Sequence, residues 1–151
     1  MSVDSSQLRD FAEGLNRVRQ DLPELMKKLV VGEGVYAVSQ AKKICKDENI
    51  IRTGNLRRSF HTDPAPRVSG SIVSIDVHNS ADYASHVEYG HLAVGRGGGS
   101  LRDRRRAAMH AGRFVRGKYI LTRAVQLTKN TQQRRIDRKL RRFFNERIGG
   151  G

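Results

Sequence analysis

The stretch SGSIVSIDVHNSADYASHVEYGH, residues 69–91, changes its hydrophobic period halfway along and thereby decides the fold. Over residues 73–77 apolar and polar side chains alternate, which predicts a half-buried antiparallel strand. Over residues 83–87 the apolar positions follow a helical spacing, and Ser80 or Asp82 is a candidate cap for that helix. A strand followed at once by a short helix is therefore expected in the middle of the chain.

The residues before this stretch supply a partner strand. Thr53 is a candidate helix cap, and residues 54–58 fit one short turn of helix that leads into a strand over residues 59–62. The segment DPAPR, residues 63–67, then breaks the chain. We expect the two strands to form a hairpin, and we expect Gly90 to end the middle helix.

Helical periodicity marks the N-terminal part of the chain. Apolar residues recur at helical spacing in two runs, which are Leu8, Phe11, Leu15, Val18 and Leu22, then Leu25, Leu29, Val35, Val38, Ala41 and Cys45. Pro23 lies between the two runs and removes a helical hydrogen bond. The pattern predicts a long N-terminal helical region with a kink or break near Pro23.

A second long helix is predicted at the other end, from Lys118 to Arg147, with an arginine-rich face opposite its apolar face. Its segment TKNTQQRR, residues 128–135, lacks an apolar contact and is expected to fray or bend the helix. Residues 92–112 are rich in Gly and Arg and are expected to form a flexible loop or arm. Residues 148–151 are expected to form a disordered tail.

Composition places all of this in one domain, residues 1–151, with an α+β fold. The long N-terminal helical region, the small antiparallel β-sheet, the short middle helix and the long basic C-terminal helix share one core. That core should be thin, because the chain has 37% hydrophobic residues and no Trp. No apolar run is long enough to span a membrane, and the N-terminus does not resemble a signal peptide. We expect a protein made in the cytoplasm and no membrane partner.

The net charge of +14 lies entirely in one part of the chain. Residues 1–90 are neutral, whereas residues 91–151 hold 17 Lys and Arg against 3 Asp and Glu. Such asymmetry indicates a surface for a polyanion or an acidic partner, with a solvated face as the alternative. The candidate partner-facing or DNA-facing residues are Arg96, Arg102, Arg104, Arg105, Arg106, Arg113, Arg116, Arg134, Arg135, Arg138, Arg141 and Arg142.

Two groups of residues invite a chemical interpretation, and each has a simpler explanation. His86, Glu88 and His91 are residue types that bind metals, but the five-residue step from one imidazole to the other turns about 500° on a helix and separates them. Ser59 and His61 would share one side of a strand with an acidic neighbour, Asp63, but no oxyanion donors are evident. We favour a polar helix end with an ion pair between subunits at Glu88 for the first group, and an exposed strand face for the second.

Two further features are interpreted as structural. The run GRGGGS, residues 95–100, has neither a preceding strand nor a following Lys with Ser or Thr, so it is not a phosphate-binding loop. Cys45 is the single cysteine and lies in a helical apolar pattern, which favours a structural thiol. We expect no catalytic, cofactor or metal site.

Three motifs in a fixed order resemble a known family. TGNLRRSF, residues 53–60, is followed by VHNSADYASHVEYGH, residues 77–91, and then by GKYILTRAVQ, residues 117–126. This combination resembles the tail-completion proteins (head–tail connector or neck proteins) of tailed double-stranded-DNA bacteriophages, over roughly residues 25–145. The insert at residues 95–112 departs from the family's pattern in being longer and more basic.

The resemblance implies an α+β subunit of the virion neck that assembles into a homo-oligomeric ring, commonly of six copies. Its implied neighbours are a head-completion or connector protein on one side and a tail terminator or tail tube on the other, and phage DNA passes through the ring. The residues that the resemblance implies at the subunit interface are Thr53, Gly54, Leu56, Arg57, Tyr83, Glu88, Tyr89 and Gly90. In such a joint Gly90 permits a left-handed turn, Tyr89 is a rigid anchor, and Glu88 meets an arginine of the same or the adjacent subunit.

The ring interpretation also bears on the basic half. A protein that contacts six to ten phosphates loses roughly 10³ to 10⁵ in affinity between low and moderate salt, so tight contacts around a whole ring would slow genome passage. We therefore expect many arginines to face acidic surfaces of partner proteins and a subset to line the channel. The alternative function is a free nucleic-acid-binding protein with an arginine-rich arm, and an enzyme is the least favoured class.

Overall fold

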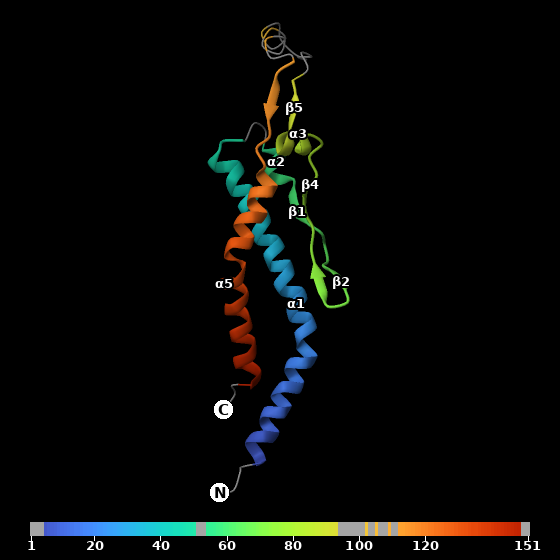
Figure 1. The fold of residues 1–151 in the computed structure, drawn as a ribbon, viewed down its shortest axis with the longest axis vertical. Coiled ribbons are helices and arrows are strands. Elements are labelled where there is room, and N and C mark those ends of the chain that lie inside the picture. The colour runs from blue at the N-terminus through green and yellow to red at the C-terminus, as the bar shows by residue number, and fades with distance from the viewer. Residues whose placement is uncertain are drawn as a thin grey trace.

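The computed structural model describes residues 5–50, 54–93 and 112–148, with the single residues 102, 105 and 109. Two long antiparallel helices run along an elongated molecule, and short antiparallel strand pairs lie beside and beyond their upper half (Figure 1). The elements, in chain order, are α1 (Ser5–Asp47), α2 (Asn55–Arg58), β1 (Phe60–Thr62), β2 (Arg67–Ser69), β3 (Ile72–Ser74), β4 (Val77–Asn79), α3 (Ala84–Tyr89), β5 (Gly90–Leu92), β6 (Phe114–Arg116) and α5 (Ile120–Ile148). The α+β prediction and the order of its elements are confirmed.

Helix α1 continues through Pro23, so of the predicted kink or break at this residue the break is wrong. Figure 1 shows α1 curving along its length instead. A proline removes only one backbone hydrogen bond of the helix. Packing on both sides of the proline maintains the helix, because Val18 and Leu29 are both buried.

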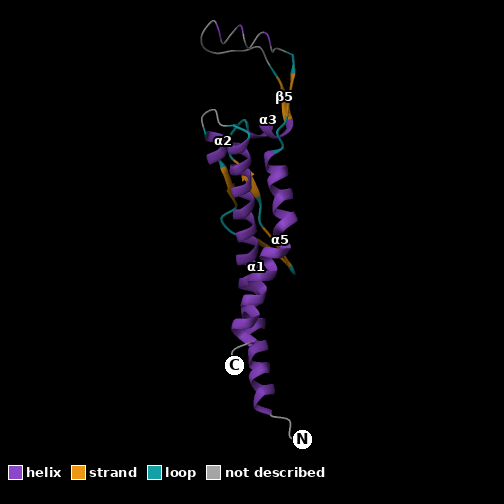
Figure 2. Ribbon diagram, turned by 90° about the vertical axis from the view of Figure 1, so that its left-hand side faces the viewer, coloured by secondary structure: helices purple, strands orange, loops and turns teal. Residues whose placement is uncertain are grey.

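Helix α5 is also uninterrupted, which corrects the expectation that residues 128–135 fray or bend it. Thr128 in this segment is buried, and its hydroxyl donates a hydrogen bond to the carbonyl of Ala124. The two helices are in close contact near the lower end of α5, where a Cβ on Gly14 would lie 2.8 Å from the carbonyl oxygen of Arg147. Figure 2 shows the helix pair turned by 90°, with the strands and the short helices beside and beyond its upper part.

The predicted hairpin forms. Strand β1 pairs antiparallel with β4, with His61 opposite His78. The single strand that we expected over residues 73–77 is divided between β3 and β4, and β3 pairs with β2 in an additional hairpin. The division follows from Arg67, whose guanidinium donates hydrogen bonds to Asp63 at 3.1 Å and to Asp76 at 2.7 Å where the chain leaves the β1–β4 pair.

A third strand pair, β5 with β6, was not predicted. It brings together the two ends of the segment that we expected to be a flexible loop, residues 92–112, most of which lies outside the described residues. The predicted disordered tail begins one residue too early, because Ile148 is still helical, and residues 149–151 lie outside the described residues.

The helix caps differ from the predicted ones. Gly54, with φ +74°, is the cap of α2, and Thr53 lies outside the described residues. Tyr83 rather than Ser80 or Asp82 precedes α3, and its side chain makes no capping hydrogen bond. Gly90 ends α3, as predicted.

The side chain of Asn79 holds the turn that follows β4. Its Oδ1 accepts a hydrogen bond from the backbone N–H of Ala81 at 2.9 Å, and its Nδ2 donates one to the carbonyl of Leu56 at 2.8 Å. Asn side chains form such turns readily. Asn79 therefore fixes the path from β4 into α3 and connects it to α2.

One cluster of buried residues joins the upper ends of α1 and α5 to the sheet. Its members are Ala41, Ile44, Cys45, Leu56, Phe60, Ala81, Ile120 and Ala124. The core is small, as the composition predicts. Cys45 is fully buried in it, and burial raises the pKa of its thiol, which confirms a structural role. Among the described residues, no helix has the length and apolar character needed to cross a bilayer.

Candidate subunit and partner interface

Glu88 joins α3 to α5. One oxygen of its carboxylate accepts a hydrogen bond from the backbone N–H of Leu121, at 2.9 Å. The other accepts hydrogen bonds from the backbone N–H of Thr122 at 2.9 Å and from the Thr122 hydroxyl at 2.7 Å. The first N–H groups of a helix lack intrahelical partners, and negative charge is favourable there. Within the chain Glu88 therefore caps α5, and the ion pair between subunits that we expected for it stays a prediction.

Two glycines, Gly90 and Gly117, allow two segments of the chain to cross in close contact beside this cap. Gly90 has φ +87°, and a Cβ on it would lie 2.4 Å from the carbonyl oxygen of Val115. A Cβ on Gly117 would lie 2.2 Å from the carbonyl oxygen of Glu88. That same carbonyl accepts a hydrogen bond from the N–H of Tyr119 at 3.1 Å. The predicted role of Gly90, a positive-φ turn, is confirmed, and the crossing is too tight for any larger residue.

Exposed aromatic side chains surround this crossing. Tyr89 is 66% exposed and its ring packs edge-on against that of Tyr119, with 6.5 Å between the ring centroids. Tyr83, Leu92 and Phe114 are also exposed. We call these five residues the aromatic surface. Exposed Tyr and Phe of this kind are typical of interface anchors, because they bring a large contact area at a low entropic cost.

A small, mostly apolar pocket of about 150 Å³ lies below Tyr89. It is lined by residues from all three motifs that the sequence singled out, among them Leu56, Val87, Glu88 and Leu121. The motif residues around Gly54 are less exposed than Tyr89. Gly54 and Leu56 are buried in this chain and Arg57 is half-buried, so their first role is within the subunit.

The predicted basic residues fall into three groups. Arg96, Arg104 and Arg106 lie outside the described residues. Eight others are exposed: Arg102, Arg105, Arg113, Arg116, Arg134, Arg138, Arg141 and Arg142. The exposed arginines of α5 recur at helical spacing and form one basic face of that helix.

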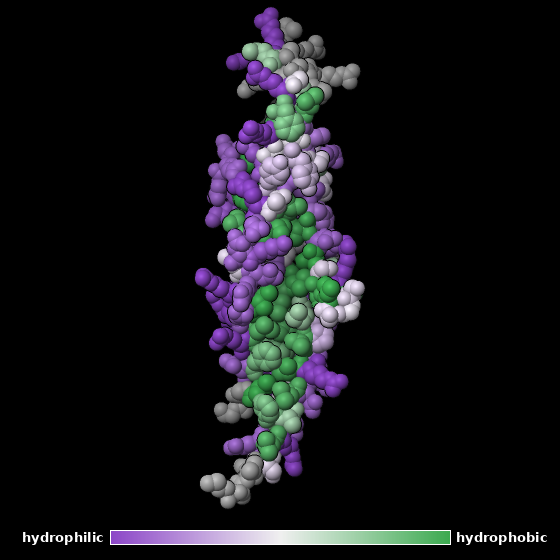
Figure 3. Space-filling model, in the orientation of Figure 1, coloured by the Kyte–Doolittle hydropathy of each residue, from purple (hydrophilic) through white to green (hydrophobic). Residues whose placement is uncertain are grey.

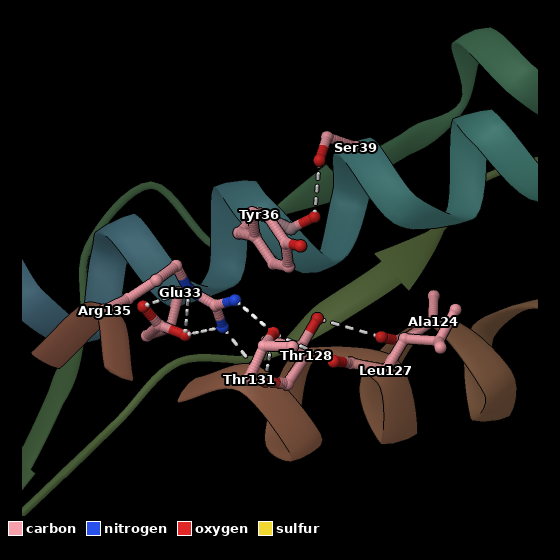
Figure 4. A network of polar contacts seen from close by, with 8 residues as sticks. All are labelled: Glu33, Tyr36, Ser39, Ala124, Leu127, Thr128, Thr131 and Arg135. Atoms are coloured by element: carbon pink, nitrogen blue, oxygen red, sulfur yellow. Dashed lines mark hydrogen bonds and ion pairs between the residues drawn. The ribbon is translucent and has the colours of Figure 1, made fainter. Parts of the chain in front are cut away.

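Arg135 is the exception, because it faces the other helix. Its guanidinium forms a bidentate pair with the carboxylate of Glu33, with Nε at 3.0 and 3.2 Å from the two oxygens (Figure 4). It also donates a hydrogen bond to the carbonyl of Thr128 at 2.9 Å and lies 3.7 Å from the ring centroid of Tyr36. Hydrogen bonding to Glu33 raises the pKa of Arg135. The expectation that Arg135 faces a partner or DNA is therefore corrected.

Two other ion pairs join α5 to α1 at regular intervals. Arg123 pairs with Glu48 near the upper end, and Arg147 pairs with Asp21 at 2.8 Å near the lower end. Arg123, Arg135 and Arg147 are spaced twelve residues apart, and their partners, the first of which follows the end of α1 directly, run in the opposite direction. Sequence reasoning missed these pairs. The twelve-residue spacing gave no signal, because it turns about 1200° and places successive arginines about 120° apart around a straight helix.

The two chemical hypotheses can be tested against the geometry. The rings of His86 and His91 lie 5.4 Å apart, while Glu88 is occupied by α5. In the part of the chain that the structure describes, no group of three His, Cys, Asp or Glu residues is placed to hold a metal ion. The Nδ1 atom of His91 is buried and has no partner among the described residues.

Ser59 and His61 do not make the hydrogen bond of a nucleophile and its base. The Ser59 hydroxyl donates to the carbonyl of Asn55 at 2.8 Å, and Nδ1 of His61 lies 2.7 Å from the Ser59 carbonyl rather than its hydroxyl. Asp63 pairs with Arg67. These contacts belong to the turn and the strand pair in which the residues lie.

Comparison with known proteins gives one result. A family model described as "Bacteriophage HK97-gp10, putative tail-component" matches residues 9–90, which is more than half of the chain. The matched region contains α1 from residue 9 onward, α2, the strands β1 to β4, α3 and the glycine that ends it. Neither the curated proteins nor the solved structures gave a match.

Proposed function

Because the chain belongs to the HK97-gp10-like family of bacteriophage tail components, we propose that it completes the tail by forming a ring at the neck of the virion. In this role it joins the tail to the DNA-filled head. The ring consists of copies of this chain, six in the form that the resemblance implies, and phage DNA passes through it. The role is structural and involves no catalysis, cofactor or metal.

The division of the chain supports this proposal. The family match ends at residue 90, and all of the excess positive charge lies in residues 91–151. The matched region contains most of the core, with the long helix α1 and the sheet. The basic helix α5 is attached to that region by the Glu88 cap and by three ion pairs. The family-matched region thus holds the basic face of α5 in position, and we place the contacts with neck partners on this face.

The neighbours that fit this face are the acidic surfaces of other neck proteins. We assign them to a head-completion or connector protein on one side and to a tail terminator or tail tube on the other. Exposed arginines such as Arg134, Arg138 and Arg141 stand on one side of a rigid helix, which suits docking to a fixed surface. Strong binding of all of them to phosphates would oppose DNA movement, because each phosphate contact adds to the affinity.

A phage deprived of this chain tests the proposal. Its lysate should contain DNA-filled heads and finished tails that remain separate, and supplying the chain from a plasmid should restore joined, infectious particles. Joined particles in the absence of the chain would refute the neck function. If the chain were then found bound to DNA in the soluble fraction, the nucleic-acid-binding alternative would replace it.

A further inference from the structure

One side of the helix pair is covered by strands in its upper half only. There, β3 and β4 form a groove with the two helices, lined by Val30 and Ala37 of α1 and by Leu121 and Val125 of α5. The described strands do not reach the lower ends of the helices (Figure 1). Below the groove the same side of the pair is therefore open.

Apolar residues continue along this open side. On α1, Met26 lies one helical turn before Val30, and helical spacing extends the row downward; on α5, the row continues the spacing of Val125. We call the following residues the apolar face: Leu8, Phe11, Leu15, Leu22 and Met26 of α1, and Ile136, Leu140 and Phe144 of α5. Figure 3 shows an apolar band from the middle of the molecule to its lower end.

The apolar face is exposed and long. Leu8 is 60% exposed, Phe11 51% and Leu15 46%, and the α1 residues extend about 27 Å along the helix at 1.5 Å per residue. The α5 residues extend only about 12 Å, so with each helix about 10 Å wide the face covers roughly 400 Å² in projection. That lies within the range of the largest apolar patches of ordinary monomers, and it is about half of the roughly 800 Å² that each partner buries in a standard interface.

The opposite side of both helices is charged. Arg134, Arg138 and Arg142 each lie two residues before a member of the apolar face, which places them about 200° around α5. On α1 the corresponding positions, two residues after the apolar ones, are Asp10, Glu13, Arg17, Glu24 and Lys28. A second copy that placed its charged side against the apolar face would bury unpaired charges, which is costly.

We propose that the apolar face is a self-association surface, on which a second copy of this chain packs with its own apolar face in a two-fold dimer. Among the surfaces of the described residues, the one that matches the apolar face in length and in apolar character is the same face of a second copy. Packed face to face, two α1–α5 pairs form a four-helix arrangement with a shared apolar interior. The basic faces of the two α5 helices then point outward on opposite sides, so their like charges are kept apart.

This association precedes and is separate from the proposed ring. A closed two-fold contact uses the same patch on both copies, whereas a ring needs two different patches. The dimer covers an apolar face that is otherwise open to water before the chain meets a virion. The inference therefore concerns the free chain and does not depend on the neck function.

The mass of the purified full chain in solution tests the inference. Sedimentation equilibrium should give twice 17.0 kDa at micromolar concentration. Leu15→Glu puts a charge into the interface and should raise the dissociation constant at least tenfold. The matched control Gln20→Glu adds the same charge on the exposed opposite side of α1, and it should remain dimeric.

A second variant, Leu8→Glu, guards against misfolding. Leu8 precedes Gly14, which faces the last described residues of α5, so the change leaves the α1–α5 contacts intact. Unchanged helical circular dichroism with loss of the dimer supports the proposal. A wild-type mass of one copy, a mass above two copies, or a dimer unaffected by Leu8→Glu and Leu15→Glu overturns it. None of these outcomes bears on the neck function, which is tested in virions.

Discussion

The carboxylate of Glu88 accepts two hydrogen bonds from Thr122, one from its backbone N–H at 2.9 Å and one from its hydroxyl at 2.7 Å. The two residues are 34 positions apart, and they join the family-matched part of the chain to the basic helix. The contact fixes where α5 begins relative to α3. Through it, the direction of the basic face depends on a residue of the motif that the sequence singled out.

Removing this cap should destabilise the chain. Glu88→Ala leaves the first N–H groups of α5 without their acceptor, so the free energy of unfolding should fall by about 1–2 kcal/mol. Urea unfolding followed by circular dichroism measures the change. Glu88→Gln retains one carboxyl-like oxygen and should lose less. Equal free energies of unfolding for the wild type and both variants would show that the cap does not stabilise the chain.

The crossing at Gly90 should tolerate no side chain. Gly90→Ala places a Cβ 2.4 Å from a carbonyl oxygen at a positive φ, so the crossing has to open. We expect a loss of about 2–3 kcal/mol or failure to fold. Gly70→Ala is the matched control, because Gly70 also has a positive φ but has no atom within 4 Å of its Cβ position.

The Gly70 change should cost only about 1–2 kcal/mol, the penalty of the backbone conformation alone. Thermal unfolding of both variants separates the two contributions. If Gly90→Ala were no more harmful than Gly70→Ala, the tight crossing would not exist in solution.

The pair between Glu33 and Arg135 should stabilise the contact between the long helices. Arg135→Ala leaves the buried Glu33 carboxylate without this partner, and the expected loss is about 1–2 kcal/mol. This lies below the 3–5 kcal/mol of a fully buried pair, because the Arg135 side chain remains 21% exposed. Arg138→Ala, an exposed position on the same helix, should change stability by less than about 0.5 kcal/mol. Equal losses from the two variants, in chemical unfolding, would contradict the pairing.

The exposed arginines of α5 should be required for joining but not for folding. Replacing Arg134, Arg138 and Arg141 together by Glu reverses the charge that faces the proposed acidic partners. In the complementation experiment, this variant should leave heads and tails separate while its helical circular dichroism is unchanged. The matched triple replacement by Lys keeps the charge and should restore joining. Normal joining with the Glu variant would remove the basic face from the proposed function.

The elements that could be predicted from the sequence are those set by local periodicity. The C-terminal helix was predicted from Lys118 to Arg147 and extends over Ile120–Ile148, because its apolar spacing is decided within each turn. The helix does not break at Pro23 for a tertiary reason, because packing on both sides outweighs the loss of one hydrogen bond.

The contacts that define the candidate interface could not be predicted because they join distant positions. The Glu33–Arg135 pair spans 102 residues and depends on the antiparallel register of two helices. The β5–β6 pair closes across a Gly-rich interval that has no period of its own, so neither strand was visible as half of a hairpin. What the order of the short motifs did indicate was the family, which the family match confirms.

The central claim concerns where the chain resides in the assembled particle. Immunogold labelling of intact tailed particles, with an antibody to this chain, tests it most directly, and particles from a phage lacking the chain serve as the control. The account predicts gold confined to the junction of head and tail. Unlabelled junctions, with the chain recovered in the soluble fraction, would contradict it.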